Sequence, residues 1–165
     1  MTISVGDKLP EAAFTVMGPE GPEQVTTADV FGGKKIALFG VPGAYTPTCH
    51  GKHMPGFVAK ADELKGKGCD GIACTSVNDV FVLDNWAKDC GAKGTIMMLA
   101  DGSADFAQKL GLNIDLTERG LGMRSKRYAM MVEDGVVKVL AVEDAPPNHD
   151  VSSAEALCSR IDNVL

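Results

Sequence analysis

The stretch that decides the fold is Pro42-Gly43-Ala44-Tyr45-Thr46-Pro47-Thr48-Cys49-His50, which comes directly after Lys34 to Val41 and its apolar run Ile36-Ala37-Leu38-Phe39. Such a continuous apolar run is typical of a strand buried on both faces, as in the middle of a parallel sheet. The Pro-Gly pair ends the strand, and Pro47 suits the first turn of a helix, where its missing N–H costs nothing. The sequence therefore places Cys49 where a central strand passes into a helix.

The position of Cys49 favours chemistry. In the first turn of a helix, free backbone N–H groups and the positive end of the dipole stabilise an anion, so the nucleophilic thiolate is favoured. The alternative is a packing residue, because free cysteine is among the most buried residue types. Thr46 stands where a dithiol oxidoreductase carries its second cysteine, and a hydroxyl cannot form a disulfide. We therefore expect attack by one cysteine, with resolution from elsewhere.

The composition is that of a globular protein, and we expect a single domain over residues 1–165, with 45% hydrophobic and 23% charged residues. The net charge of −6 argues against nucleic acid and anionic membranes as partners. The N-terminal residues lack the pattern of a secretion signal, and no apolar run approaches the length of a membrane span. These features predict a cytoplasmic protein.

Five cysteines stand at positions 49, 69, 74, 90 and 158. They form an odd set without a Cys-x-x-Cys pair, which disfavours a disulfide framework or a zinc site and fits a reducing compartment. His50 and His53 stand near Cys49, but a fourth ligand is missing, so we expect no metal there and place both at the pocket edge or in solvent. His149, in a loop, is expected at the surface.

The remaining patterns predict an α/β chain. An N-terminal hairpin is expected over residues 12–17 and 23–26, with a short capped helix over 27–31. Strands over 69–77 and 95–99 enclose a helix that contains Trp86, which gives βαβ units of a parallel sheet. A further helix is expected over 104–110, a loop over 111–122, and a hairpin over 128–132 and 136–140 around Asp134-Gly135.

Two helices complete the expected set. The first runs from about Thr48 to Gly66, with a kink at Pro55-Gly56, and the last opens at Ser152-Ser153. Cys158 falls on the apolar stripe of that last helix, so we assign it to the core.

The motif Pro42-x-x-x-Thr46-x-x-Cys49 resembles the active-site motif of the peroxiredoxins, which are thiol peroxidases on a thioredoxin-like fold. The wider string from Phe39 to Cys49 resembles the type II, peroxiredoxin-5-like subfamily. The likeness continues through His53-Met54-Pro55-Gly56-Phe57, Ser76-Val77-Asn78-Asp79, Trp86, Leu99-Ala100-Asp101 and Arg124-Ser125-Lys126-Arg127-Tyr128. It implies a thioredoxin-like α/β fold with a central mixed sheet flanked by helices, an N-terminal β-hairpin, and no cofactor or metal.

The resemblance also implies roles for single residues. Cys49 would be the peroxidatic residue, assisted by its own backbone N–H. Arg127 would hold the thiolate and a peroxide oxygen, Thr46 would hydrogen-bond the substrate, and Pro42 would shield Cys49 from water. From the residues alone, Arg124, Lys126 or Arg127 could each be a solvated charge, and Pro42 could simply end the strand.

Oxidised Cys49 must be returned to the thiol, and the sequence leaves two routes open. Some type II members carry a second cysteine 25 residues after the first, and Cys74 stands at that spacing. A disulfide would need Cα atoms within about 7 Å, and Cys74 is equally a candidate for a buried core residue. The other route is an external thiol from glutathione, glutaredoxin or thioredoxin.

We therefore expect a thiol-dependent peroxidase that reduces hydrogen peroxide and organic hydroperoxides, and by resemblance a homodimer. One rival is a thiol–disulfide oxidoreductase, which the absence of Cys-x-x-Cys disfavours. Another is a redox sensor or holdase that uses oxidation of Cys49 only as a signal.

Overall fold

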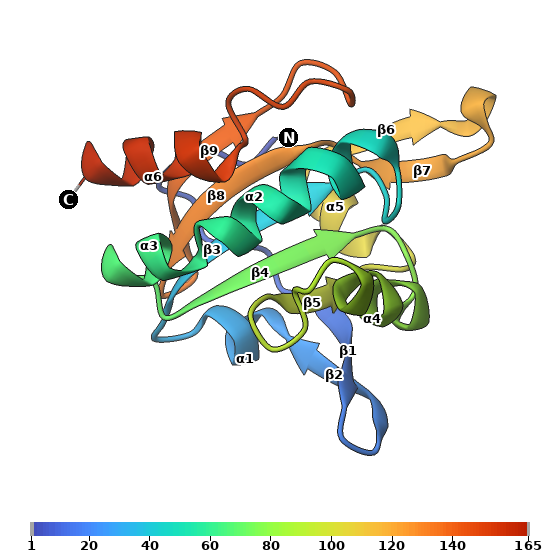
Figure 1. Cartoon of the computed structure of the whole chain (residues 1–165), viewed down its shortest axis with the longest axis horizontal. Coiled ribbons are helices and arrows are strands. Elements are labelled where there is room, and N and C mark those ends of the chain that lie inside the picture. The colour runs from blue at the N-terminus through green and yellow to red at the C-terminus, as the bar shows by residue number, and fades with distance from the viewer. Residues whose placement is uncertain (1, 165) are drawn as a thin grey trace.

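A computed structural model describes residues 2–164. Its centre is a mixed sheet of seven strands in the order β2-β1-β5-β4-β3-β8-β9 (Figure 1). The parallel strands in the middle are β3 (Lys35–Val41), β4 (Gly71–Ser76) and β5 (Met97–Ala100). All residues of β3 except the first are buried, which confirms the prediction of a central strand from its apolar run.

Antiparallel hairpins extend the sheet at both edges. One edge carries β1 (Ala13–Gly18) and β2 (Gly21–Thr26), which is the predicted N-terminal hairpin. The other carries β8 (Tyr128–Glu133) and β9 (Val136–Val142). Asp134 and Gly135 connect these two strands with φ angles of 48° and 77°, as a tight two-residue turn requires. The predicted mixed sheet is confirmed.

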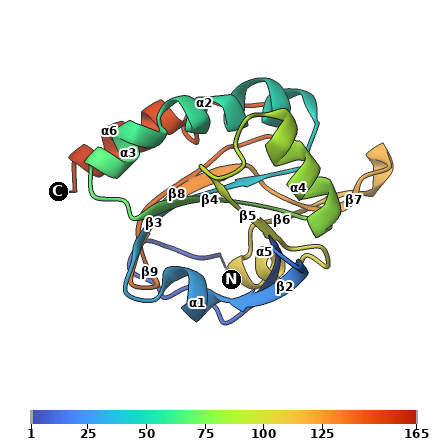
Figure 2. The same ribbon diagram turned by 60° about the horizontal axis from the view of Figure 1, so that its bottom comes forward.

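Helices cover both faces of the sheet, as Figure 2 shows. One face carries α2 (Met54–Ala59), α3 (Ala61–Gly66), α4 (Val80–Asp89) and α6 (Ala154–Asp162). The opposite face carries α1 (Thr27–Phe31) and α5 (Asp105–Leu110). Within residues 2–164, no helix combines the length and apolar character that crossing a bilayer would need.

The expected continuous helix over 48–66 is wrong in detail. A π-helix over Cys49–His53 comes first, α2 follows, and the chain breaks at Lys60 before α3 begins. The break therefore lies after the Pro55-Gly56 pair that was expected to produce it. Pro55 instead occupies the first turn of α2, where a missing N–H is tolerated.

Residues 111–122 were expected to be a loop, and this expectation is also wrong. The chain forms β6 (Asn113–Leu116), a short 3-10 helix over Thr117–Arg119 and β7 (Gly122–Ser125). These elements form a separate two-stranded hairpin that projects from one end of the molecule, opposite the end that carries α6 (Figure 1). We call residues 113–125 the arm.

Candidate active site

The core of the sheet fixes the position of Cys49. Phe39, near the end of β3, stacks on Phe57 of α2 with ring centroids 4.0 Å apart, and it also contacts the ring of His53. These contacts hold the π-helix over the end of β3, and Cys49 is the first residue of that helix. The Cys49 side chain is fully buried.

The π-helix has a local cause in the sequence. In an α-helix the N–H of residue 55 would bond the carbonyl of residue 51, but Pro55 has no N–H. The wider turn changes this register, and the N–H of Met54 bonds the carbonyl of Cys49 instead. Single π-turns within helices are frequent at functional sites.

Arg127 is the cation of the site. It stands just before β8 and is buried. Its Nη2 donates to Cys49 Sγ at 3.0 Å, its Nη1 bonds His53 Nδ1 at 3.0 Å, and its Nε donates to the Pro146 carbonyl at 3.0 Å. The three contacts fix the plane of the guanidinium, which stabilises a thiolate through a charge-assisted bond.

His53 supports Arg127 from behind. Because a guanidinium only donates, Nδ1 of His53 must accept, and the proton lies on Nε2, which donates to the Ser152 carbonyl at 2.8 Å. Burial, and then the positive charge of Arg127, hold the pKa of His53 well below its usual value. His53 is thus neutral and acts as an acceptor.

A buried carboxylate anchors this network on the other side. Glu143 Oε2 accepts from the Ser152 N–H at 2.7 Å, the Ser152 hydroxyl at 2.6 Å and the Asp150 N–H at 2.8 Å. Burial opposes the charged form, but these hydrogen bonds prevail and lower the pKa of Glu143. The segment between β9 and α6 is thereby tied to His53, Arg127 and Cys49.

A pocket of about 240 Å³ adjoins this cluster, and its lining includes Pro42, Thr46 and Arg127. Thr46 donates its hydroxyl hydrogen to the Gly43 carbonyl at 2.7 Å. Its oxygen lone pairs therefore remain free to accept a hydrogen bond from a bound molecule. Pro42 is buried at the strand end, where it can also exclude water.

The arm supplies another wall of the same pocket. Leu116, Arg119 and Leu121 line it together with the prolines of the active-site turn and of residues 146–147. Arg124 fastens the arm, since its Nε donates to the Leu121 carbonyl at 2.8 Å and its Nη1 donates to the Pro42 carbonyl at 3.4 Å. Of the candidate cations, Arg127 contacts Cys49 and Arg124 holds the arm.

Next to the active-site turn, two aromatic side chains, Tyr45 and Trp86, donate hydrogen bonds to polar neighbours. Tyr45 adopts a φ of 64°, which is unusual for an aromatic residue, and its hydroxyl donates to Asp89 at 2.6 Å. That bond raises the pKa of Tyr45 to about 12. Trp86 Nε1 donates to His50 Nδ1 at 3.0 Å, and Cys90 Sγ lies 3.6 Å from the same nitrogen.

The other cysteines differ from Cys49 in their surroundings. Cys74, Cys69 and Cys158 are buried and Cys90 is partly exposed. Burial, and then the nearness of Cys49, raise the pKa of the Cys74 thiol well above its usual value. Cys158 lies in the core, as expected, and burial and Glu63 raise its pKa to about 12.

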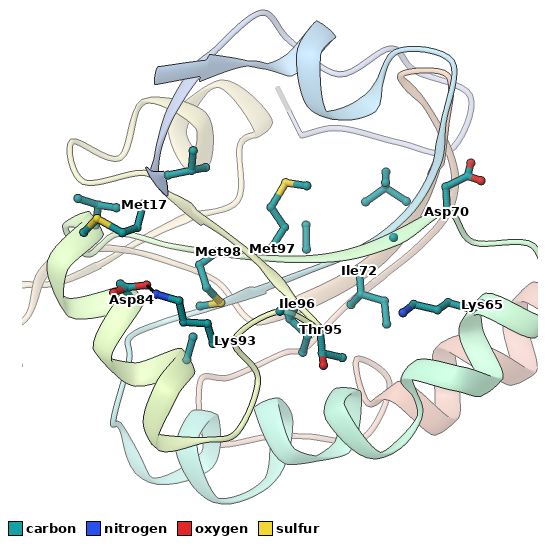
Figure 3. A pocket seen from close by; sticks show the side chains of 17 residues that line it. Met17, Lys65, Asp70, Ile72, Asp84, Lys93, Thr95, Ile96, Met97 and Met98 are labelled. Atoms are coloured by element: carbon teal, nitrogen blue, oxygen red, sulfur yellow. Dashed lines mark hydrogen bonds and ion pairs between the residues drawn. The ribbon is translucent and has the colours of Figure 1, made fainter. Parts of the chain in front are cut away.

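A second hollow, of about 390 Å³, lies beside β4, β5 and α4 (Figure 3). Met17, Met97 and Met98 line it, together with the ion pair of Lys93 and Asp84 at 2.8 Å. Neither cysteine nor histidine lines this hollow. It therefore offers no thiol, and the candidate site is the one at Cys49.

Comparisons with known proteins agree with this choice. A family model described as Redoxin matches residues 4–158. The chain is 52% identical over 147 residues to the chloroplastic Peroxiredoxin-2E of Arabidopsis thaliana. This match covers 87% of the chain and 63% of the longer relative. The chain belongs to the peroxiredoxins. This chain is also 46% identical over 156 residues to Peroxiredoxin-2B of Arabidopsis thaliana, and the match covers 93% of this chain and 94% of that protein.

Solved structures give the same answer for the peroxiredoxin fold. The reduced Prx3 of Vibrio vulnificus, solved in complex with H2O2, superposes with a TM-score of 0.92 at 45% identity, covering 97% of this chain and 99% of that chain. The thioredoxin-like fold and the type II resemblance inferred from the sequence are therefore confirmed. The peroxiredoxin is a thiol-dependent peroxidase.

The structure brings together Cys49, Thr46, Arg127 and Pro42, the four residues predicted for the site. The expectations for two histidines are wrong. His53 is buried behind Arg127, because its acceptor nitrogen completes the guanidinium contacts, and His149 is half-buried with its ring 5.0 Å from that of His53.

Sequence reasoning did not predict the roles of Glu143 and Ser152 at the site, and Ser152 was expected only to open the last helix. A single acidic residue at the end of a strand carries no local signal. Its role depends on the return of residues 150–152 to the site, which only the tertiary fold reveals.

Among residues 2–164, no cluster of three His, Cys, Asp or Glu side chains is arranged as ligands of a metal ion.

Proposed function

We propose that Cys49 is the peroxidatic residue and that its thiolate reduces hydrogen peroxide and organic hydroperoxides. The observation that carries this assignment is the 3.0 Å hydrogen bond from Arg127 Nη2 to the fully buried Cys49 Sγ. A permanent cation at this distance stabilises the thiolate in a site from which water is excluded.

The reaction is a displacement at oxygen. The Cys49 sulfur forms a bond to the terminal peroxide oxygen, the O–O bond breaks, and its electron pair leaves with the second oxygen, which takes up a proton. Sulfur is oxidised to sulfenic acid, and the peroxide is reduced to water or an alcohol. Arg127 stabilises the thiolate first and the departing oxygen later, while Thr46 accepts a hydrogen bond from the peroxide O–H.

An external thiol then returns the sulfenic acid to the resting state. The first thiol forms a mixed disulfide with Cys49 and releases water, and a second thiol displaces Cys49 from it. Glutathione, glutaredoxin or thioredoxin would supply these thiols. In support of this route over an internal one, Cys74 lies fully buried in β4, which pairs with strands on both sides, and its pKa is raised.

Intact-mass analysis after one equivalent of hydrogen peroxide tests the assignment, with the wild type compared with Cys49→Ser and Cys74→Ser. We expect a trappable sulfenic acid in the wild type and in Cys74→Ser, and none in Cys49→Ser. A loss of two hydrogen masses that disappears in Cys74→Ser would make Cys74 the resolving partner. Unchanged oxidation of Cys49→Ser would refute the role of Cys49.

Two assays separate this function from its rivals. A thiol–disulfide oxidoreductase would reduce insulin disulfides catalytically, and we expect no such turnover. A sensor or holdase would react with peroxide once, whereas we expect sustained peroxide consumption in the presence of a thiol donor.

We further propose that the enzyme is a cytoplasmic homodimer. The described cysteines are all free thiols, which suits a reducing compartment, although the relative Peroxiredoxin-2E is named as chloroplastic. Tyr45 and Phe81 are large side chains exposed near the active-site turn and on α4, where a second copy could cover them. Cell fractionation tests the location, and analytical ultracentrifugation of the reduced protein tests the dimer.

A further inference from the structure

The pocket beside Cys49 is larger than hydrogen peroxide needs. Its volume of about 240 Å³ corresponds to about eight water molecules, at about 30 Å³ each. Leu116, Leu121 and several prolines form most of its walls. Hydrophobic walls of this kind favour an organic group over water.

The charges at the pocket are all of one sign. Arg127 and Arg119 are the charged residues that line it, and no aspartate or glutamate does so. The two acids of the arm, Asp115 and Glu118, are not among the lining residues. This is unexpected in a protein of net charge −6, because acids outnumber bases over the whole chain.

The two arginines have different tasks. Three of the five N–H donors of Arg127 are engaged by Cys49, His53 and the Pro146 carbonyl, so Arg127 acts at the sulfur. Arg119 is exposed at the end of the 3-10 helix, and none of the ion pairs found within residues 2–164 involves it. Arg119 is therefore free to bind an anion of the substrate.

The arm that carries Arg119 is tied to the active-site turn. Within the arm, Arg124 donates to the Leu121 carbonyl, and it also donates to the Pro42 carbonyl of the active-site turn. The cation at the rim and the apolar walls therefore line the same pocket as Arg127, whose Nη2 lies 3.0 Å from the buried Cys49 Sγ.

We propose that Arg119 recognises a carboxylate, and that the preferred organic substrates are amphipathic hydroperoxides that carry one, such as free fatty-acid hydroperoxides. This inference rests on the proposed peroxidase function. The alkyl chain lies along the apolar walls, the carboxylate meets Arg119, and the hydroperoxide reaches Cys49. There the S–O bond forms, the O–O bond breaks, and the alkoxide leaves with the electron pair and is protonated to the alcohol.

The test uses three probes: linoleic acid hydroperoxide, its methyl ester, and hydrogen peroxide. Formation of the Cys49 sulfenic acid is followed in a single turnover by acid quenching and intact mass, so that no reductant is involved. Wild type is compared with Arg119→Gln, Arg119→Lys and Arg160→Gln. Arg160 is an exposed arginine of α6, at the end of the molecule opposite the arm, and serves as the matched control (Figure 1).

We expect the wild type to react about fivefold faster with the free acid than with the methyl ester, as suits an exposed pair of charges. Arg119→Gln should abolish this ratio, Arg119→Lys should retain it in part, and Arg160→Gln should leave it unchanged. All four proteins should react equally with hydrogen peroxide. The preference for the acid should also shrink as salt is added.

Equal rates with the acid and the ester in the wild type would overturn the proposal. So would a loss in Arg119→Gln that affects all three peroxides alike, because that would show a general effect on the arm. Absence of any reaction with hydrogen peroxide in the wild type would instead overturn the proposed function itself.

Discussion

The buried neutral His53 makes a quantitative prediction about stability. Its pKa lies well below 6.5 in the folded protein, because burial and Arg127 disfavour the proton, and His149 faces the same ring. The unfolded chain therefore binds more protons than the folded one as the pH falls below about 6.5. This contribution to stability is complete above the unfolded pKa and is lost as the pH decreases.

The size of the effect follows from linkage. At pH 5.5, one unit below the ordinary pKa of histidine, a histidine that stays neutral on folding lowers the free energy of unfolding by about 1.4 kcal/mol relative to neutral pH. His53→Gln removes this titration while retaining one acceptor for Arg127 and one donor for the Ser152 carbonyl. The pKa of Glu143 is lowered from 4.5, so that group does not titrate in this range.

Urea unfolding of the reduced protein at pH 5.5, 6.5 and 7.5 measures the difference. Between pH 7.5 and 5.5 the wild type should lose about 1.4 kcal/mol more unfolding free energy than His53→Gln. Titrating groups that lie far from His53 affect both proteins alike and cancel in the comparison. Parallel curves for the two proteins would refute the assignment of His53 as a buried neutral acceptor.

Four further predictions concern the site and its support. Arg127→Lys should slow sulfenic acid formation about 100-fold, since it loses the fork of donors, and a quenched-flow rate within tenfold of wild type would contradict this. Thr46→Val should slow the same step about tenfold through loss of one hydrogen bond, with Thr46→Ser close to wild type. Gly40→Ala should cost about 1–3 kcal/mol in urea unfolding, because the new Cβ would lie 2.3 Å from the ring of Tyr128, and an unchanged midpoint would count against this packing. In the native protein at neutral pH, Cys74 should escape iodoacetamide until urea unfolds the chain, as peptide mapping can check, because burial raises its pKa.

The sequence predicted the structure correctly where a local pattern of residues determines it. The apolar run before Pro42 identified the central strand, and Asp134-Gly135 identified the hairpin turn. The site could be assembled in outline because the motif around Cys49 is contiguous, and Arg127 was selected by family resemblance.

What the sequence could not supply depends on distant contacts. The arm escaped prediction because Asn113–Leu116 and Gly122–Ser125 are only four residues long each, and the alternation of polar and apolar residues in Asn113–Leu116 is too short to distinguish a strand from a loop. The burial of His53 arises from Phe39, Arg127 and the Ser152 carbonyl, three partners from different parts of the chain. No spacing within one helix could reveal them.

The hydrogen bonds between Glu143 and residues 150–152 matter for the order in which the site is completed during synthesis. Cys49 and its helix leave the ribosome long before the last segment, yet the support for Arg127 includes the Ser152 carbonyl through His53. A nascent chain that has not yet delivered this segment lacks a fixed cation beside its thiol. The contacts around Cys49 are therefore complete only once residues 150–152 have joined the fold.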